Sequence, residues 1–277
     1  MVDANTFTFP VTGTPATPAT GAGAIAPLDD VRYHDNRLVL RNGEARGFFR
    51  SWICQYAQIG FENFVARFCA IPGEMLRDAS FCFARRLLLA GNLSSLLAVD
   101  PVPNGASNAL AFDQFYAVGN GGAGSLDDVY VYGWQSVIWK AGSVDLSTAG
   151  QYCIRLDRCD DMYVDLEWLA ADKAAAPNHE GALLAACPRG AFAVNTLINH
   201  RKGVTVTTVA SDFSLNAADY GTCPNVRIET SEGVTGATLV HRFVKGAHFD
   251  VKRVLTAAAR TGAEEYEIWA AGGSGFH

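Results

Sequence analysis

The sequence predicts a mainly β protein that folds as a parallel β-helix with a flexible N-terminal tail. Short segments with alternating apolar residues recur along the chain, the later ones at nearly constant intervals, and segments with helical periodicity are scarce. Aliphatic, aromatic and Cys residues make up 49% of the chain and charged residues 18%, a composition typical of a folded protein with a sizeable core. A β-sandwich is the alternative architecture.

The recurring segment is a small or polar residue, an apolar one, any residue and a second apolar one. The eight segments begin at Ser80, Asn108, Asp128, Asp161, Ala182, Gly203, Asn225 and Gly246. Their second positions are 28, 20, 33, 21, 21, 22 and 21 residues apart. A repeat of this length indicates stacked coils, and a strand once per coil fits three strands and three turns. Antiparallel sandwiches also place short strands at regular intervals, so the sandwich stays open.

The composition divides the chain into four regions. We expect an N-terminal tail with a linker, then a cap or small separate module, then the β-helix, and last a C-terminal cap or tail, over residues 1–29, 30–78, 79–255 and 256–277. The linker Thr12–Pro27 consists almost wholly of Thr, Pro, Ala and Gly, which cannot build a core. A turn is expected at Asn42-Gly43, and the best helix candidate is Val251–Arg260.

Charge, hydropathy and cysteine usage narrow the function classes. A net charge of −6 argues against a nucleic-acid partner, and no apolar run is long enough to predict membrane insertion. The N-terminus lacks the basic and apolar regions of a signal peptide, so we expect synthesis in the cytoplasm and release only as part of a particle. The seven cysteines include no CxxC, which favours free buried thiols and predicts no metal and no cofactor.

Three segments carry a resemblance to a known fold family. Lys202–Asp212, Pro224–Val240 and Asp160–Trp168 resemble right-handed β-helix proteins of the pectate-lyase type, which include phage tailspikes and spikes of gene transfer agents. The resemblance spans roughly residues 80–255 and is one of style, without a signature motif. It implies a homotrimer whose N-terminal tail anchors it to other proteins of a virion or phage-like particle. It also implies a shaft that binds or cleaves a host cell-surface polysaccharide.

Alternation along the strands predicts which side chains face outward. If the apolar pattern positions point inward, an aromatic rung should lie beside an acidic one. Aromatic rings stack on the apolar faces of sugars, and carboxylates accept hydrogen bonds from sugar hydroxyls. The predicted glycan-binding residues are Tyr130, Tyr132 and Trp134 on one rung and Tyr163, Asp165 and Glu167 on the next.

A polysaccharide depolymerase on the same scaffold is the alternative function. Asp165 and Glu167 are two residues apart on one strand face, which separates their backbones by about 6 to 7 Å, and the carboxylate pairs of glycosidases lie about 5 to 9.5 Å apart. No motif fixes a reaction, so the sequence favours a receptor-binding spike over an enzyme. A third hypothesis is an assembly protein without affinity for glycans.

Overall fold

The computed structural model describes residues 37–271 except 56–57, 77–78, 80, 94–95, 100–107, 122–126, 148–150, 173–178, 209–221, 243, 245–247 and 256–267. Every regular element among the described residues is a β-strand, which confirms the mainly β prediction. No described segment is a helix that could cross a membrane. The predicted N-terminal tail lies outside the described residues.

The strands form two sheets of nine, which we name the odd sheet and the even sheet after the strand numbers. The odd sheet contains β1 (Arg37–Arg46), β3 (Gln58–Arg67), β5 (Cys82–Ala90), β7 (Ala109–Val118), β9 (Ser136–Ser147), β11 (Asp161–Ala171), β13 (Arg189–Ile198), β15 (Asn225–Glu232) and β17 (Phe249–Leu255). The even sheet contains β2 (Ile53–Gln55), β4 (Gly73–Leu76), β6 (Leu96–Val99), β8 (Val129–Tyr132), β10 (Tyr152–Asp157), β12 (Glu180–Ala185), β14 (Lys202–Thr207), β16 (Leu239–Arg242) and β18 (Ile268–Ala271).

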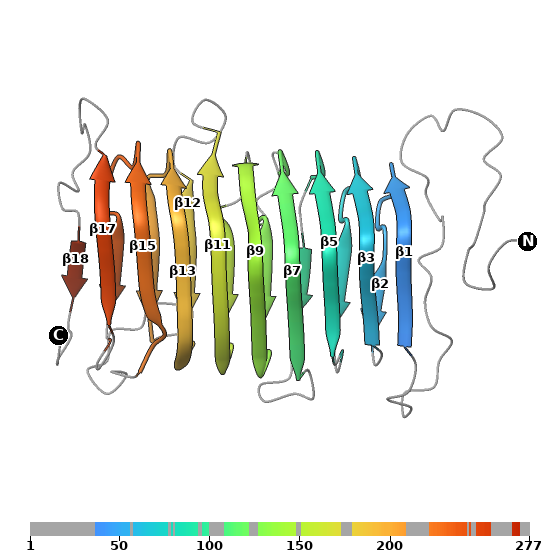
Figure 1. Cartoon of the computed structure of the whole chain (residues 1–277), viewed down its shortest axis with the longest axis horizontal. Coiled ribbons are helices and arrows are strands. Elements are labelled where there is room, and N and C mark those ends of the chain that lie inside the picture. The colour runs from blue at the N-terminus through green and yellow to red at the C-terminus, as the bar shows by residue number, and fades with distance from the viewer. Residues whose placement is uncertain are drawn as a thin grey trace, which may run out of the picture.

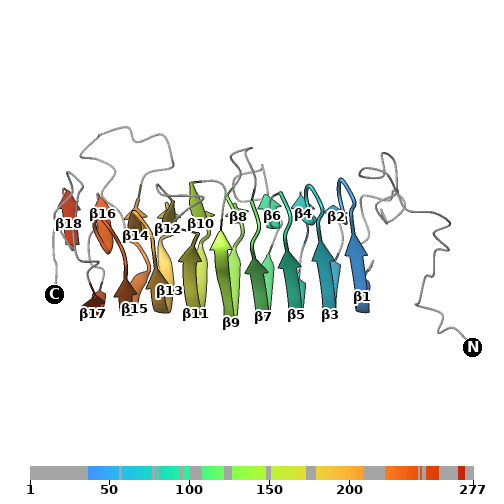
Figure 2. The same cartoon turned by 90° about the horizontal axis from the view of Figure 1, so that it is seen from above.

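The chain alternates between the sheets, so that each coil adds one strand to each of them (Figures 1 and 2). Neighbours within a sheet pair in parallel, as β1 with β3 and β10 with β12. This pairing differs from the antiparallel pairing of the β-sandwich alternative. Figure 1 shows the odd strands pointing up in front and the even strands pointing down behind them. The inner faces of the two sheets therefore enclose one elongated core.

Large apolar side chains from successive coils fill that core. Phe112, Phe115 and Trp139 are fully buried, and the Trp139 ring centroid lies 5.5 Å from that of Phe112 and 4.8 Å from that of Phe115. Closer to the first coil, the rings of Trp52 and Phe61 lie 4.5 Å apart. Burying such side chains stabilises the folded chain by about 1.5 to 3 kcal/mol each. The buried apolar residues form one main cluster, which includes strands of both sheets.

A stacked column of left-handed residues bends the first five odd strands. The positive φ values of 51°, 52°, 55°, 59° and 51° belong to Asn42, Asn63, Arg86, Gln114 and Ala141. In β5 and β7 two consecutive exposed residues mark this position, after which the alternation resumes with an inward residue. The turn expected at Asn42-Gly43 is therefore wrong: Asn42 bends a strand that continues to Arg46.

Buried asparagines hold successive coils together where odd strands end. The side-chain amide of Asn92 donates to the Ala66 carbonyl at 3.1 Å and to Asn120 Oδ1 at 2.8 Å. Its Oδ1 accepts a hydrogen bond from the Cys69 backbone N–H at 2.8 Å, and Asn120 Nδ2 donates to the Leu89 carbonyl at 2.8 Å. One side chain thus satisfies polar backbone groups that the core would otherwise leave unpaired.

The predicted 21-residue coil of three strands is wrong in two respects. Each coil has two strands, and its length varies: Arg37 pairs with Gln58, 21 residues later, whereas Ala191 pairs with Asn225, 34 residues later. The near-constant spacing arose because the pattern joined segments of both sheets, such as Met162 on β11 and Leu183 on β12. Each sheet has its own apolar alternation, and the sequence does not label which sheet a segment joins.

Two further expectations concern the strands at the ends of the stack. The strands β1 to β4 belong to the same two sheets as the later strands, so no break between sheets occurs near residue 79. The helix expected over Val251–Arg260 is wrong for residues 251–255, which continue strand β17. Its remaining residues lie outside the described part of the chain.

Candidate functional site

The six residues predicted to bind glycan do not form one patch. Tyr130 and Tyr132 lie on β8 in the even sheet, whereas Tyr163, Asp165 and Glu167 lie on β11 in the odd sheet. In register, Tyr130 pairs with Arg155, and Tyr163 pairs with Ile138 and Ala191. The expected adjacency of the aromatic and acidic rungs is therefore wrong, because β8 and β11 belong to different sheets.

Trp134 is also misplaced by the sequence prediction. It is 1% exposed, and its indole N–H donates to the Ala98 carbonyl at 3.1 Å. It follows Gly133, whose φ of 77° redirects the chain between β8 and β9. The alternation of β8 therefore does not extend to Trp134, which fills the core.

The residues on β11 do face outward as predicted. The burial pattern of β11 alternates, and Tyr163 is 50% exposed. Asp165 Oδ1 lies 3.9 Å from the Arg227 guanidinium. Glu167 helps to raise the pKa of Tyr116, for which burial is the larger cause. Asp165 and Glu167 thus share one face of the odd sheet.

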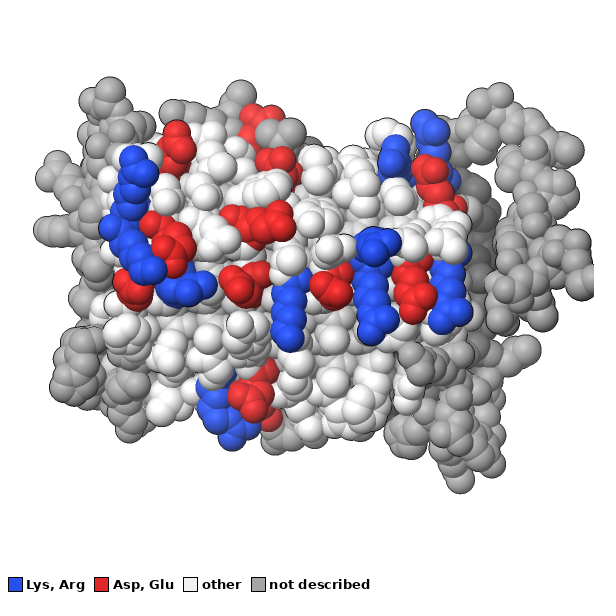
Figure 3. Space-filling model, in the orientation of Figure 1, with Lys and Arg blue, Asp and Glu red and all other residues white. Residues whose placement is uncertain are grey.

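A row of alternating charges crosses this outer face. From β1 to β11 the register aligns positive and negative side chains in strict alternation: Arg41, Glu62, Arg85, Asp113, Lys140 and Asp165. Ala193 interrupts the row on β13, and Arg227 and Asp250 complete it. Figure 3 shows this alternation along the long axis of the molecule. Parallel in-register strands bring equivalent residues about 4.8 Å apart, so alternation avoids repulsion between neighbouring coils.

An apolar column runs beside the charged row, two residues earlier on each strand. In register order it contains Val39, Gly60, Phe83, Ala111, Ile138, Tyr163 and Ala191. The Phe83 ring leans over Gly60, in the space where a side chain at residue 60 would lie. Ala111 is the small residue between Phe83 and Ile138, which leaves a depression over β7.

That depression is an open pocket of about 390 Å³. Phe83 and Ile138 border it, and Ala111 lies between them. Four side chains of the charged row line its other side: Glu62, Arg85, Asp113 and Lys140. Two positive and two negative groups leave the pocket without formal net charge, and it offers both hydrogen-bond donors and acceptors beside apolar surface.

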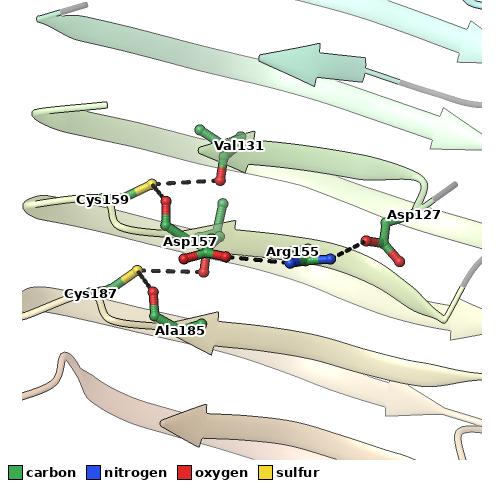
Figure 4. A network of polar contacts seen from close by, with 8 residues as sticks. Asp127, Val131, Arg155, Asp157, Cys159, Ala185 and Cys187 are labelled. Carbon is green, nitrogen blue, oxygen red and sulfur yellow. Dashed lines mark hydrogen bonds and ion pairs between the residues drawn. The ribbon is translucent and has the colours of Figure 1, made fainter. Parts of the chain in front are cut away.

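A second polar cluster lies on the outer face of the even sheet (Figure 4). The Arg155 guanidinium lies 3.8 Å from Asp127 and 3.4 Å from Asp157, and its carbon atom lies 4.6 Å from the centroid of the Tyr130 ring. Asp127 accepts backbone hydrogen bonds from Gln151 and Tyr152. Burial raises the pKa of Asp127 and raises that of Tyr130 to about 12. These internal contacts indicate a cluster that fixes the fold.

Comparisons with models of known families, with curated proteins and with solved structures find nothing that matches this chain.

The sequence prediction missed the pocket itself. Its signal was present: Arg85-Arg86, Asp113-Gln114 and Lys140-Ala141 are outward pairs at the bend of successive strands. Aligning the chain on these pairs would have joined β5, β7 and β9 with offsets of 28 and 27 residues. The apolar pattern alone could not reveal it, because both sheets share that pattern.

Proposed function

We propose that the chain is a right-handed parallel β-helix that binds a linear cell-surface polysaccharide along the outer face of its odd sheet. In this proposal the chain forms a homotrimer that is a spike or fibre of a phage-like particle. The main support is the pocket over β7, where Phe83 and Ile138 border an apolar floor beside a row of alternating positive and negative side chains.

A general rule supports the proposed right-handedness. Connections between parallel strands of one sheet are right-handed in about 98% of cases, because the twist of the strands favours that crossover. Successive odd strands are parallel neighbours connected through an even strand. This supports the right-handed form of the coil.

The chemistry of the pocket suits a neutral or weakly charged glycan. Sugar rings present apolar C–H faces, for which Phe83 and Ile138 offer partners. Their hydroxyl groups both donate and accept hydrogen bonds, which matches alternating Arg85, Asp113 and Lys140. The column and the row run along the long axis of the stack, so a linear polymer can contact several coils at once.

Depolymerisation is the second candidate function. Asp165 and Glu167 lie on the same outer face as the pocket, in the odd sheet and two coils from its centre on β7. A polymer that fills the pocket and extends toward β11 would reach Tyr163, with these carboxylates beside it on the same strand. Binding and cleavage would therefore use the same face, and a measurement of polymer length distinguishes them.

The test is co-sedimentation of the purified protein with a panel of bacterial capsular polysaccharides, combined with gel filtration of the polymer. The variants Phe83→Ala and Tyr163→Ala remove rings from the apolar column. Phe68→Ala is the matched control, because Phe68 is 57% exposed but follows the end of β3 and contacts Arg46. We expect a panel member to bind the wild type and the control, and to bind both column variants at least tenfold more weakly.

The outcomes separate the three functions. Binding with unchanged polymer length supports a binding spike. A polymer that the wild type shortens and the Asp165→Asn variant does not shorten supports the depolymerase. Binding that survives Phe83→Ala and Tyr163→Ala would refute this face as the site. Failure of the whole panel to bind would favour an assembly protein.

A further inference from the structure

A separate cluster of potential metal ligands lies inside the coil, away from the proposed glycan face. Cys153 on β10, His179 just before β12 and His200 just before β14 are all buried, and their ligand atoms lie within 4.8 Å of one another. The three residues come from three successive coils. Their sequence separations of 26 and 21 residues are those of neighbouring coils, so the fold alone brings them together.

The hydrogen bonds of His200 leave one ring nitrogen available. Its Nε2 lies 2.9 Å from the Leu169 carbonyl, an acceptor, so Nε2 carries the proton and donates it. Its Nδ1 is buried and has no hydrogen-bond partner among the described residues. A lone pair on a buried nitrogen without a donor is costly in a protein interior. Metal ligation by one ring nitrogen while the other donates to a carbonyl is the usual arrangement of histidine ligands.

His179 has a comparable arrangement. Its Nε2 lies 2.8 Å from Ser147 Oγ, and its Nδ1 lies 3.8 Å from Cys153 Sγ. When Nε2 donates to the serine oxygen, the Nδ1 lone pair points toward the cysteine sulfur. In the absence of a metal, the thiol can donate to that lone pair.

A buried carboxyl group lies near the cysteine. Asp128 is 1% exposed, and its carboxyl group interacts with the hydroxyl group of Ser147, which also contacts His179. It lies close enough to Cys153 to act on the thiol electrostatically.

We propose that Cys153 Sγ, His179 Nδ1 and His200 Nδ1 supply three of the four ligands of a tetrahedral site for a divalent transition metal of the zinc class. Tetrahedral zinc with ordinary Zn–N and Zn–S bond lengths separates its ligand atoms by about 3.5 Å. The observed 3.8 Å between Cys153 Sγ and His179 Nδ1 is already close to this value. Binding displaces the thiol proton to solvent and forms the metal–sulfur bond. The metal then links β10, β12 and β14 across three coils.

Cobalt(II) is the probe, because it substitutes for zinc and reports its ligands. A thiolate–cobalt bond gives a near-ultraviolet charge-transfer band, and strong visible d–d bands indicate tetrahedral geometry. Untagged protein is refolded with Co²⁺ after metal removal, and its spectrum is compared with those of three variants. Cys153→Ser and His200→Gln change the site, and the glutamine amide can still donate to the Leu169 carbonyl. Cys187→Ser is the control, since Cys187 is equally buried but lies outside the cluster.

We expect one Co²⁺ per chain with both bands in the wild type and in Cys187→Ser. The charge-transfer band should disappear in Cys153→Ser, and Co²⁺ affinity should fall at least tenfold in His200→Gln. A wild type that folds without either band, or a band that persists in Cys153→Ser, would overturn the site. If Cys153→Ser fails to fold, two other measurements test the proposal: the Co²⁺ affinity of His200→Gln, and the Zn²⁺ content of wild-type protein purified from zinc-supplemented cells. Wild-type protein without zinc would refute the proposal.

Discussion

The phenyl ring of Phe83 on β5 occupies the space above Gly60, its register partner on β3. A methyl group at residue 60 would overlap the far edge of this ring, which is half-buried and can swing away. We predict that Gly60→Ala moves Phe83 toward Ala111 and narrows the pocket. Glycan affinity should fall while the free energy of unfolding drops by less than about 1.5 kcal/mol. Polysaccharide binding and urea denaturation measure the two effects.

Gly73 is the matched contrast, because the ring above it is Trp52, which is 2% exposed and cannot swing into solvent. Gly73→Ala should therefore lower the free energy of unfolding by about 1 to 3 kcal/mol through overpacking. Equal losses of stability for Gly60→Ala and Gly73→Ala would contradict this account of Phe83.

Asn92 is expected to be a main polar determinant of stability. Asn92→Ala removes the hydrogen bonds to Cys69, Ala66 and Asn120, and leaves these buried groups without that partner. We expect a loss of about 2 to 4 kcal/mol in the free energy of unfolding. Leu93→Ala is the control, since Leu93 is 62% exposed and should change stability little. Similar losses in both variants would show that the asparagine bonds have no special weight.

Reversing one charge in the alternating row should destabilise the stack. Lys140 lies between Asp113 and Asp165 in register, so Lys140→Glu would place three carboxylates on adjacent coils. We expect a loss of about 0.5 to 1 kcal/mol at low salt, because these side chains are solvated. Added salt should reduce the loss.

The measurement is urea denaturation at two sodium chloride concentrations, with Lys140→Gln as the neutral control. The glutamine variant should lose less stability and depend less on salt. A loss for Lys140→Glu that salt does not reduce would point to packing rather than charge.

Glu74 gives a pH-dependent prediction. Its side chain is 7% exposed and lies 3.1 Å from Arg50, and burial raises its pKa more than Arg50 lowers it. The folded chain therefore holds this proton more tightly than the unfolded chain. As the pH rises above the ordinary value of 4.5, wild-type stability falls until the raised pKa is passed.

Glu74→Gln lacks this titration. The stability of the variant relative to the wild type should therefore increase between about pH 4 and about pH 7, by about 1.4 kcal/mol for each unit by which the pKa is raised. Urea denaturation across this range measures it, with Glu62→Gln as the more exposed control. A relative stability that decreases with pH would show that the Arg50 contact outweighs burial.

The alternation of apolar residues was enough to predict a β protein and its stacked coils. Segments such as Asp161–Val164 and Gly203–Val206 do form parallel strands, and the outward positions of Tyr163 and Asp165 followed from period two. These features depend on local backbone geometry, which each segment carries in its own sequence.

Only the tertiary structure decided which strands belong to which of the two sheets. Coil lengths differ because loops of different length join the strands, and only the hydrogen-bonded register shows that Phe83, Ala111 and Ile138 are neighbours. The same register brings Cys153 near His179 and His200. By itself the sequence determined the local alternation and, for strands such as β11, the inner and outer faces. The stacking of coils decided which outer faces meet, because contacts between coils depend on register and not on local periodicity.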